Sequence, residues 1–318
     1  MIVLVFTGGT ISMRYDATAG GAIPALAGKD ILDLVPQLSD IAELEVDEFG
    51  GFPGPHMTVD RMWELRERIE SHVKRREVTG VVVTHGTDSL EESAYLVARS
   101  LATDKPIVFT GAMRAASTLG WDGPANLAAA VLVAASEQAR GFGVLVVMSD
   151  RVYAGLDVTK AHTHMLDAFE SPGLGPLGVV DDGRVIFRRA IPSAAEIVDA
   201  PRLGGPVDIV YAYAGSDSRL LDASRQEGRG VVIAAMGRGN VPPAMVPGIE
   251  RWVADKKPVV VASRALRGRV GPSYGYPGGG RRLQDLGAIL AGSRRPQQAR
   301  IDLMLALGAG VDARDLFD

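Results

Sequence analysis

Two threonines stand where a side-chain hydroxyl can act as a nucleophile. Thr10 lies in the segment Thr7–Ile11, directly after an apolar run. Thr87 lies in the segment Thr84–Ala94, directly after another such run. A residue at the carboxyl end of a buried parallel strand faces the crevice in which open α/β sheets bind ligands. Because a threonine hydroxyl attacks poorly until a base takes its proton, the pattern also requires a base elsewhere in the chain.

Asp88 and Lys160 are the candidate partners of Thr87. Asp88 follows Thr87 directly, and Lys160 ends the segment Asp157–Lys160, which comes after a further apolar run. A lysine can serve as a base where burial lowers its pKa, although a neighbouring carboxylate opposes that shift. The three residues would then share the nucleophile, base and orienting-group logic of a Ser–His–Asp triad. We also expect Asp88 to be a helix N-cap, with Glu91 completing a capping box.

Composition limits the classes of protein to which the chain can belong. Its 318 residues suffice for two domains, and the formal net charge of −4 gives no reason to expect nucleic acid or an anionic membrane as a partner. The absence of cysteine excludes disulfides, a thiolate nucleophile and thiolate metal sites. His162 and His164 have no third ligand at a suitable spacing, so no metal site is expected.

Targeting signals are not evident in the sequence. The first apolar run begins at Ile2 without a basic segment or cleavage site before it. No apolar stretch approaches the roughly 20 residues that span a bilayer. We therefore expect a cytoplasmic protein.

Short runs rich in Val and Ile alternate with helical patterns along the chain. The runs contain no polar–apolar alternation, as is typical of strands covered on both faces. This order predicts a parallel, doubly wound α/β sheet. The predicted strands are Ile2–Phe6, Val81–Val83, Ile107–Phe109, Val144–Met148, Val207–Ala212, Val231–Ala235 and Val259–Ala262. The predicted helices are Asp60–Arg75, Asp88–Leu101, Asp122–Ala139, Pro243–Lys256 and Pro296–Leu307.

Proline- and glycine-rich composition indicates a linker at residues 191–205. We expect a larger, doubly wound N-terminal domain over residues 1–190 and a smaller, parallel C-terminal α/β domain over residues 206–318. One loop, Ser12–Lys29, is long enough to require a functional reason. Since it directly follows Thr10, it is a candidate lid over the site.

Seven segments of this chain resemble motifs of bacterial L-asparaginases, in the order that the family has them. The resemblance covers nearly the whole chain, and the motif around Thr87 and Asp88 is highly specific. The matching segments are Thr7–Ile11, Thr84–Ala94, Gly111–Arg114, Asp122–Leu127, Asp157–Lys160, Gly237–Asn240 and Pro296–Arg300.

The resemblance implies hydrolysis of L-asparagine to L-aspartate and ammonia through a threonine acyl-enzyme. Thr10 matches the lid-proximal threonine taken to carry the acyl group, and Thr87 is the alternative nucleophile, with Lys160 and Asp88 as its partners. Asp88 would also hold the substrate α-ammonium. Backbone N–H groups near Thr87 and Ala112 would stabilise the oxyanion. The family implies no metal or organic cofactor, a small-molecule substrate, and a homo-oligomer, either a dimer or a homotetramer of close dimers.

Two substrate-contacting segments depart from the family's pattern. Many members carry a serine in the loop that clamps the substrate carboxylate, but here the loop reads Gly54-Pro55. The Gly54 N–H can still donate, whereas Pro55 has none. The family's lid tyrosine falls at Ala22, and Tyr15 on the same loop is the candidate substitute. A lost hydrogen-bond partner lowers affinity sharply. Another amide such as L-glutamine is therefore an alternative substrate, and a non-catalytic amino-acid-binding paralogue is an alternative function.

Overall fold

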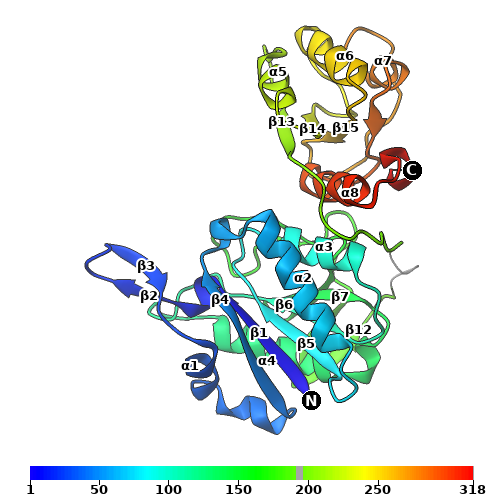
Figure 1. Cartoon of the computed structure of the whole chain (residues 1–318). Helices are drawn as coiled ribbons and strands as arrows, with labels where there is room; N and C mark the ends of the chain where they lie inside the picture. Colours follow the sequence, from blue (N-terminus) through cyan, green and yellow to red (C-terminus); the bar gives the residue numbers. More distant parts are fainter. Residues whose placement is uncertain (191–195, 318) are drawn as a thin grey trace. The chain divides into compact units, whose positions relative to one another are not determined.

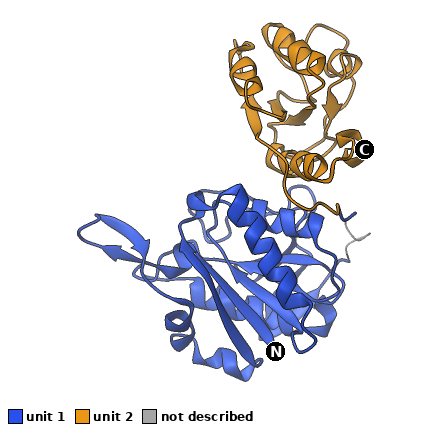
Figure 2. Ribbon diagram, in the orientation of Figure 1, with its two compact units in different colours: residues 1–197 blue, residues 198–318 orange. Residues whose placement is uncertain are grey.

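The structure, a computed structural model, describes residues 1–190 and 196–317. The chain divides into two compact units, Met1–Ile197 and Val198–Asp318 (Figure 2). The expected linker, 191–205, includes residues 191–195, which lie outside the described residues. Its last part packs within unit 2, where the Gly204 N–H donates to the Met304 carbonyl at 2.8 Å.

Unit 1 contains an eight-stranded sheet with the order β12-β11-β8-β7-β6-β5-β1-β4 (Figure 1). The half from β7 to β4 is parallel, and the half from β12 to β7 is antiparallel. The strands are β1 Ile2–Gly8, β4 Leu44–Phe52, β5 Gly80–Thr84, β6 Ile107–Thr110, β7 Val144–Met148, β8 Arg151–Ala154, β11 Gly178–Asp181 and β12 Arg184–Phe187.

The antiparallel half corrects the expectation of a sheet that is parallel throughout. Ser149 and Asp150 join β7 to β8 with φ values of 51° and 58°, and Asp182 and Gly183 join β11 to β12 with φ values of 47° and 69°. Positive φ at both central residues is the mark of a type I′ turn, whose twist suits an antiparallel hairpin. The Asp182-Gly183 pair is the usual sequence signal for such a turn, so the second of these two hairpins could have been predicted.

Helices cover both faces of this sheet (Figure 1), which confirms the doubly wound architecture. Alternate residues of β1 enter different cores: Val3 and Val5 pack with α2 and α3, whereas Ile2 and Leu4 pack with α1 and α4. Burial on both faces explains the continuous apolar runs of the parallel strands. The helices are α1 Gly28–Asp33, α2 Val59–Val73, α3 Leu90–Ser100 and α4 Gly123–Ala135.

The expected long loop at Ser12–Lys29 contains a hairpin, made of β2 (Met13–Asp16) and β3 (Gly21–Pro24). The hairpin projects from unit 1 (Figure 1). Its base is fixed to the loop after β6, because the Ala116 N–H donates to the Met13 carbonyl at 2.9 Å. The segment following Thr10 is therefore an ordered antiparallel ribbon.

The order of the strands locates a ligand-binding edge. The strand β1 has β4 on one side and β5 on the other, so the connection after β1 and the connection from β5 to β6 run in opposite directions along the sheet. In the register of the sheet, Phe6 lies opposite Thr84, and Thr84 lies opposite Thr110. The loops that follow β1, β5 and β6 consequently start at one level, at the position where open α/β sheets bind ligands.

Unit 2 is a smaller α/β layer structure with a parallel sheet of order β13-β14-β15-β16. The helix α8 lies on one face of the sheet, and α5 and α6 lie on the other (Figure 1). Trp252 of α6 is fully buried against this second face. None of the described helices is long and apolar enough to span a membrane. The elements are β13 Val207–Tyr211, α5 Arg219–Arg225, β14 Gly230–Ala235, α6 Val246–Ala254, β15 Val259–Ser263, α7 Gly280–Asp285, β16 Ile289–Leu290 and α8 Pro296–Ala309.

Candidate active site

The turn after β1 presents Thr10 at the carboxyl edge of the sheet. Thr7 is buried, and its Oγ1 donates to the Thr84 carbonyl at 2.9 Å, which fixes the end of β1 to the end of β5. Gly9 has φ of 83°, a conformation that favours glycine. Thr10 then opens a short 3-10 turn with its side chain half-buried. Thr10 is thus placed on a rigid turn rather than on a free loop.

Three glycines bring the loops after β1, β4 and β5 into direct backbone contact. A Cβ added at Gly9 would lie 2.5 Å from the Gly86 Cα, and one at Gly86 would lie 2.4 Å from the Gly54 Cα. Real Cβ atoms do not approach backbone this closely, so only glycine permits the contact. The Ser89 hydroxyl also donates to the Gly54 carbonyl at 2.7 Å. The Thr10 turn, the Gly54 turn and the Thr87 turn therefore form one packed unit.

Lys160 joins Thr87 and Asp88 in one hydrogen-bonded group. Its Nζ donates to Thr87 Oγ1 at 2.8 Å and to Asp88 Oδ1 at 2.7 Å. The Thr87 residue is 5% exposed, and the Lys160 and Asp88 side chains are 17% and 59% exposed. The hydroxyl and the ammonium are thus largely shielded from solvent, while the carboxylate reaches it. Residues far apart in the sequence meet here, which no spacing rule could have shown.

The backbone of Lys160 is held by a residue that sequence reasoning did not assign to the site. Lys160 lies in β9 (Thr159–Lys160), which pairs with β10 (Phe169–Glu170). The Lys160 N–H donates to Glu91 Oε2 at 2.7 Å. Glu91 stands in the first turn of α3 and so connects the helix after the Thr87 turn to the lysine strand.

The expectation that Asp88 caps α3 is wrong. Ser89 occupies the N-cap position, without a side-chain capping bond, and the helix begins at Leu90. The Asp88 carboxylate turns to the Lys160 ammonium and Glu91 turns to the Lys160 backbone, so both members of the expected capping box are used elsewhere. An ionic partner gives a charge-assisted hydrogen bond that outcompetes a cap to a neutral N–H.

Ala112 lies in a fourth turn, after β6, that adjoins Thr87. A Cβ added at the preceding Gly111 would lie 3.3 Å from the Thr87 Cγ2. Asn126 holds this turn, since its Nδ2 donates to the Gly111 carbonyl at 3.0 Å and to Asp122 Oδ2 at 2.9 Å. Asp122 in turn accepts from the backbone N–H groups of the next two residues of the turn. The i, i+4 spacing of this acid and amide was the available signal for their positioning role.

His85 is a buried imidazole two residues before Thr87, and sequence reasoning gave it no role. It is fully buried, and its ring lies 6.0 Å from the ring of Phe109, measured between centroids. Burial lowers the pKa of His85 from 6.5 to about 4, because the charged imidazolium would lose its hydration, although the Gly86 carbonyl partly opposes this effect. The ring is therefore neutral at neutral pH.

Of the remaining two sequence-predicted segments, the Gly54 turn contacts this group, and the hairpin with Tyr15 projects from unit 1 (Figure 1). Gly54 is buried against Asp88, with an added Cβ 3.3 Å from the Asp88 Cβ, whereas Pro55 is exposed. Tyr15 is 63% exposed on the β2–β3 hairpin, directly opposite Ala22. Directly opposed residues of an antiparallel pair project from the same face. The tyrosine thus projects from the same face as the position that the family alignment assigns to its lid residue.

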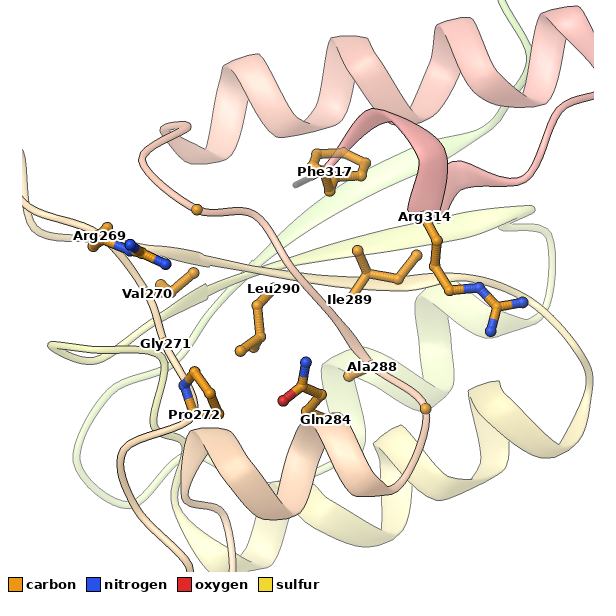
Figure 3. A pocket seen from close by; sticks show the side chains of 12 residues that line it. Arg269, Val270, Gly271, Pro272, Gln284, Ala288, Ile289, Leu290, Arg314 and Phe317 are labelled. Atoms are coloured by element: carbon orange, nitrogen blue, oxygen red, sulfur yellow. The ribbon is translucent and has the colours of Figure 1, made fainter.

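Unit 2 contains a cavity of its own. It has a volume of about 430 Å³ and is bordered by β16, α7 and the C-terminal turn (Figure 3). Arg269, Arg314 and Gln284 supply its polar side chains, and no hydroxyl or carboxylate residue lines it. Its lining therefore contains no candidate nucleophile. Within the described residues, no group of three or more His, Asp or Glu side chains could hold a metal ion.

Comparison with known proteins places both units in one family. Residues 1–193 match "Asparaginase, N-terminal" and residues 206–317 match "Glutaminase/Asparaginase C-terminal domain". The chain is 37% identical over 320 residues to a probable L-asparaginase of Deinococcus radiodurans, covering 99% of this chain and 95% of that protein. It is 31% identical over 312 residues to an L-asparaginase of Bacillus licheniformis, covering 97% and 95%.

A solved structure agrees with these sequence matches. The crystal structure of a probable cytoplasmic L-asparaginase from Campylobacter jejuni has a TM-score of 0.88 and 30% sequence identity, and the match covers 99% of this chain and 97% of that one. The strand order, the threonine turns and the two matching domains lead to one conclusion: the chain belongs to the asparaginase family.

Proposed function

We propose that this protein is an L-asparagine amidohydrolase that acts through a threonine acyl-enzyme. The observation that carries the proposal is the placement of Lys160 Nζ within 2.8 Å of Thr87 Oγ1 and 2.7 Å of Asp88 Oδ1. A lysine within hydrogen-bond reach of both a hydroxyl and a carboxylate suits the proton transfers that acyl transfer to a neighbouring threonine requires. The relatives named L-asparaginase support asparagine as the amide.

In the first step, Thr10 Oγ attacks the side-chain amide carbon of asparagine. An ester bond forms, the C–N bond breaks, and ammonia leaves with the proton that the hydroxyl gives up. Within the described residues, the Thr10 hydroxyl makes no hydrogen bond that would restrain it. In the second step, water attacks the ester and releases aspartate. Two steps of moderate difficulty thereby replace one direct attack by water.

Thr87, Lys160 and Asp88 move the proton in both steps. In its free-amine form, Lys160 accepts the proton of Thr87 as Thr87 takes that of the nucleophile or the water. Lys160 then delivers a proton to the leaving ammonia in the first step and, through Thr87, to the released Thr10 oxygen in the second. The backbone N–H groups at Thr87 and Ala112 stabilise the oxyanion. The contact between the turns that carry them supports this assignment. Thr87 is the alternative nucleophile.

Substrate recognition is assigned to the groups around this centre. The exposed part of the Asp88 carboxylate holds the α-ammonium of the substrate, and the Gly54 N–H faces its α-carboxylate in place of a serine. Pro55 shapes this turn without donating. Tyr15 takes the place of the family's lid tyrosine, supported by its register opposite Ala22. The reaction requires no metal or organic cofactor.

L-Glutamine is the second candidate substrate, favoured by the Gly54-Pro55 sequence of the clamp. A clamp that lacks a side-chain hydroxyl holds the α-carboxylate through fewer bonds, and this weakens discrimination between amides of different length. Ammonia release measured with each amide decides between them. A kcat/KM at least about tenfold higher for asparagine supports the first assignment, and equal values support glutamine as a further substrate.

We also propose a cytoplasmic homo-oligomer, either a dimer or a tetramer of close dimers. The location is supported by the description of the Campylobacter jejuni relative as cytoplasmic. Association is supported by a surface patch of unit 2 where Tyr211, Tyr213 and Leu220, each about half exposed, line one shallow pocket. Light scattering after gel filtration tests this: the mass of a dimer or a tetramer is expected, and a monomer at micromolar concentration would contradict it.

The function is tested by ammonia release from L-asparagine, compared with a Thr10→Ala variant. Steady release by the wild-type protein and its loss in the variant are expected. Tight binding of asparagine without turnover by the wild-type protein would instead identify a non-catalytic amino-acid-binding member of the family.

A further inference from the structure

The hydrogen-bonding state of His85 can be deduced from its one polar contact. Its Nδ1 lies 2.9 Å from the Gly86 carbonyl oxygen. A carbonyl can only accept, so Nδ1 carries the proton and donates it. In a neutral imidazole, the other nitrogen, Nε2, is then an acceptor. That atom is buried and has no hydrogen-bond partner within the described part of the chain.

An imidazole in this position is unfavourable for packing alone. A buried acceptor without a partner loses its hydration and gains nothing in return. An apolar side chain would fill the space beside Phe109 without that loss. The remaining polar function of the His85 ring is its bond to Gly86, so the ring's contribution must be sought at that carbonyl.

The Gly86 carbonyl belongs to the same peptide group as the Thr87 N–H. Because a peptide group is planar and trans, fixing the direction of the oxygen also fixes the opposite direction of the N–H. Gly86 has no side chain to restrain this plane, and besides His85 Nδ1 its oxygen accepts only a long bond from the Ser89 N–H, at 3.4 Å, among the described residues. Among the described residues, the imidazole is therefore the main hydrogen-bonding restraint on the direction of the Gly86 oxygen.

The backbone of His85 is itself immobile. Its N–H donates to the Thr110 carbonyl at 2.8 Å. A Cβ added at Gly111 would lie 2.6 Å from the His85 carbonyl oxygen, and one added at Gly9 would lie 2.9 Å from its carbonyl carbon. The ring thus extends from a fixed point, between the turns that present Thr10 and Ala112, to the peptide that presents Thr87.

We infer that His85, as a neutral imidazole protonated on Nδ1, is a positioning residue that orients the Gly86–Thr87 peptide toward the reacting carbonyl. The effect of His85 on turnover rests on the proposed function. Its effect on the orientation of the Gly86–Thr87 peptide does not. It assigns His85 no role in proton transfer, since both its burial and its lowered pKa of about 4 keep the ring neutral. A misplaced donor at a catalytic centre lowers the rate through loss of alignment.

The test compares His85→Asn with His85→Gln in the full-length protein. The amide nitrogen of asparagine can occupy the position of Nδ1, whereas that of glutamine extends to the position of Nε2. We expect Asn to retain kcat within about fivefold and Gln to lower it by about 100-fold with little change in KM. The Asn and Gln variants are similarly polar, and their secondary structure and Tm are compared. This comparison separates a loss of positioning from a general loss of folding.

Two NMR measurements accompany the kinetics and do not depend on turnover. Correlation of ring protons with ¹⁵N should show a neutral, Nδ1-protonated His85 at neutral pH. The Thr87 amide resonance should shift in the Gln variant and stay near its wild-type position in the Asn variant. An Nε2-protonated ring, an unmoved Thr87 amide in both variants, or equal kcat in both would overturn the inference.

The same design separates this inference from the proposed function. Absence of amide hydrolysis by the wild-type protein, together with the expected tautomer and amide shift, would reject the function and keep the positioning role. Hydrolysis by the wild-type protein with equal kcat in both variants would reject the positioning role and keep the function.

Discussion

At the scale of single residues, the two threonines have different surroundings. Thr87 Oγ1 accepts a hydrogen bond from Lys160, whereas the Thr10 hydroxyl is half-buried and makes no hydrogen bond within the described residues. A hydroxyl already engaged with a base suits proton relay, and an unengaged one suits attack on a carbonyl. This difference is the structural reason for preferring Thr10 as the residue that carries the acyl group.

Removal of either hydroxyl should abolish most of the activity. We expect Thr10→Ala and Thr87→Val each to lower kcat by at least about 10³-fold, because each removes a group that reacts or relays a proton. Thr79→Val is the matched control, since Thr79 is exposed and precedes β5, whereas Thr87 follows it. Near-wild-type turnover in either active-site variant, measured as ammonia release, would remove that residue from the mechanism.

Lys160 should be irreplaceable by another cation. We expect Lys160→Met to lower kcat by about 10² to 10⁴-fold, the range for loss of a general base. Lys160→Arg should not restore the rate, because a guanidinium does not deprotonate and so cannot accept the proton of Thr87. Lys74→Met, at a lysine side chain that is 71% exposed, is the control for loss of one positive charge. Restoration of turnover by arginine would assign Lys160 a purely electrostatic role.

At the scale of elements, the site depends on how closely three loops approach one another. The strands β1, β4 and β5 end at one edge of the sheet, and glycines at positions 9, 54 and 86 let the following turns touch through their backbones. Catalytic groups on such turns keep their spacing because the sheet beneath them is buried on both faces. The glycine motifs are thus as much part of the site as the threonines.

A methyl group at Gly86 should separate these turns. We expect Gly86→Ala to lower the free energy of unfolding by roughly 1–3 kcal/mol, since its Cβ would overlap the Gly54 backbone. Activity should fall further than stability, because the Thr87 turn moves relative to Gly54. Gly51→Ala is the control, as a Cβ there meets nothing within 4 Å and its φ is not positive. Urea unfolding and ammonia release measure the two effects, and equal behaviour of both variants would contradict the account.

The sequence predicted the buried strands more completely than the exposed elements. The predicted strand Val144–Met148 is confirmed with the same bounds, and the other buried parallel runs differ only at their ends. The strand β4 was missed because it is an edge strand carrying Glu45 and Asp47, and charged edges protect a sheet from pairing with other chains. Apolar runs identify strands only where both faces are covered.

Local sequence patterns also could not show contacts between distant segments. The side chains at Asp88 and Glu91 fit a capping box, but Lys160 from 72 residues further along takes the carboxylate of Asp88 instead. The same limit applies to His85, whose role depends on burial and on a bond to its neighbour. Residue types and order predicted the members of the site, and the tertiary structure determined their partners.

At the scale of the whole molecule, the two units divide the family's architecture between them. Both units match asparaginase domains, while the hydrogen-bonded Thr87–Lys160–Asp88 group lies entirely in unit 1. The stability of unit 1 is coupled to this site through His85, because a buried neutral imidazole makes folding depend on pH. The site and the fold should thus respond together to acidification.

Acid should destabilise the protein through His85. The folded-state pKa of about 4 lies below the unfolded value of 6.5, so the unfolded state binds more protons between these values. Stability is therefore full above pH 6.5 and is lost as the pH falls toward 4, by about 2 kcal/mol between pH 7 and pH 5. Urea unfolding at several pH values measures this loss.

The variant His85→Asn should lose this contribution to the pH dependence. An exposed histidine serves as control, and His164→Asn should keep the wild-type slope. Comparison between pH 5 and 7 separates the histidine from carboxylates such as Glu45 and Glu70, whose pKa values are lowered by hydrogen bonds to Arg75 and Lys74 and which act at lower pH. An unchanged slope in His85→Asn would show that the ring is not the group that titrates.

The most direct test of the account is ammonia release from L-asparagine with and without hydroxylamine, in the wild-type protein and in Thr10→Ala. Hydroxylamine intercepts an ester to give an aspartyl hydroxamate, so an acyl-enzyme predicts this product while ammonia is still released in the first step. An acyl group carried by Thr10 predicts both products from the wild-type protein and neither from the variant. Ammonia release by Thr10→Ala at a rate near that of the wild-type protein would contradict it.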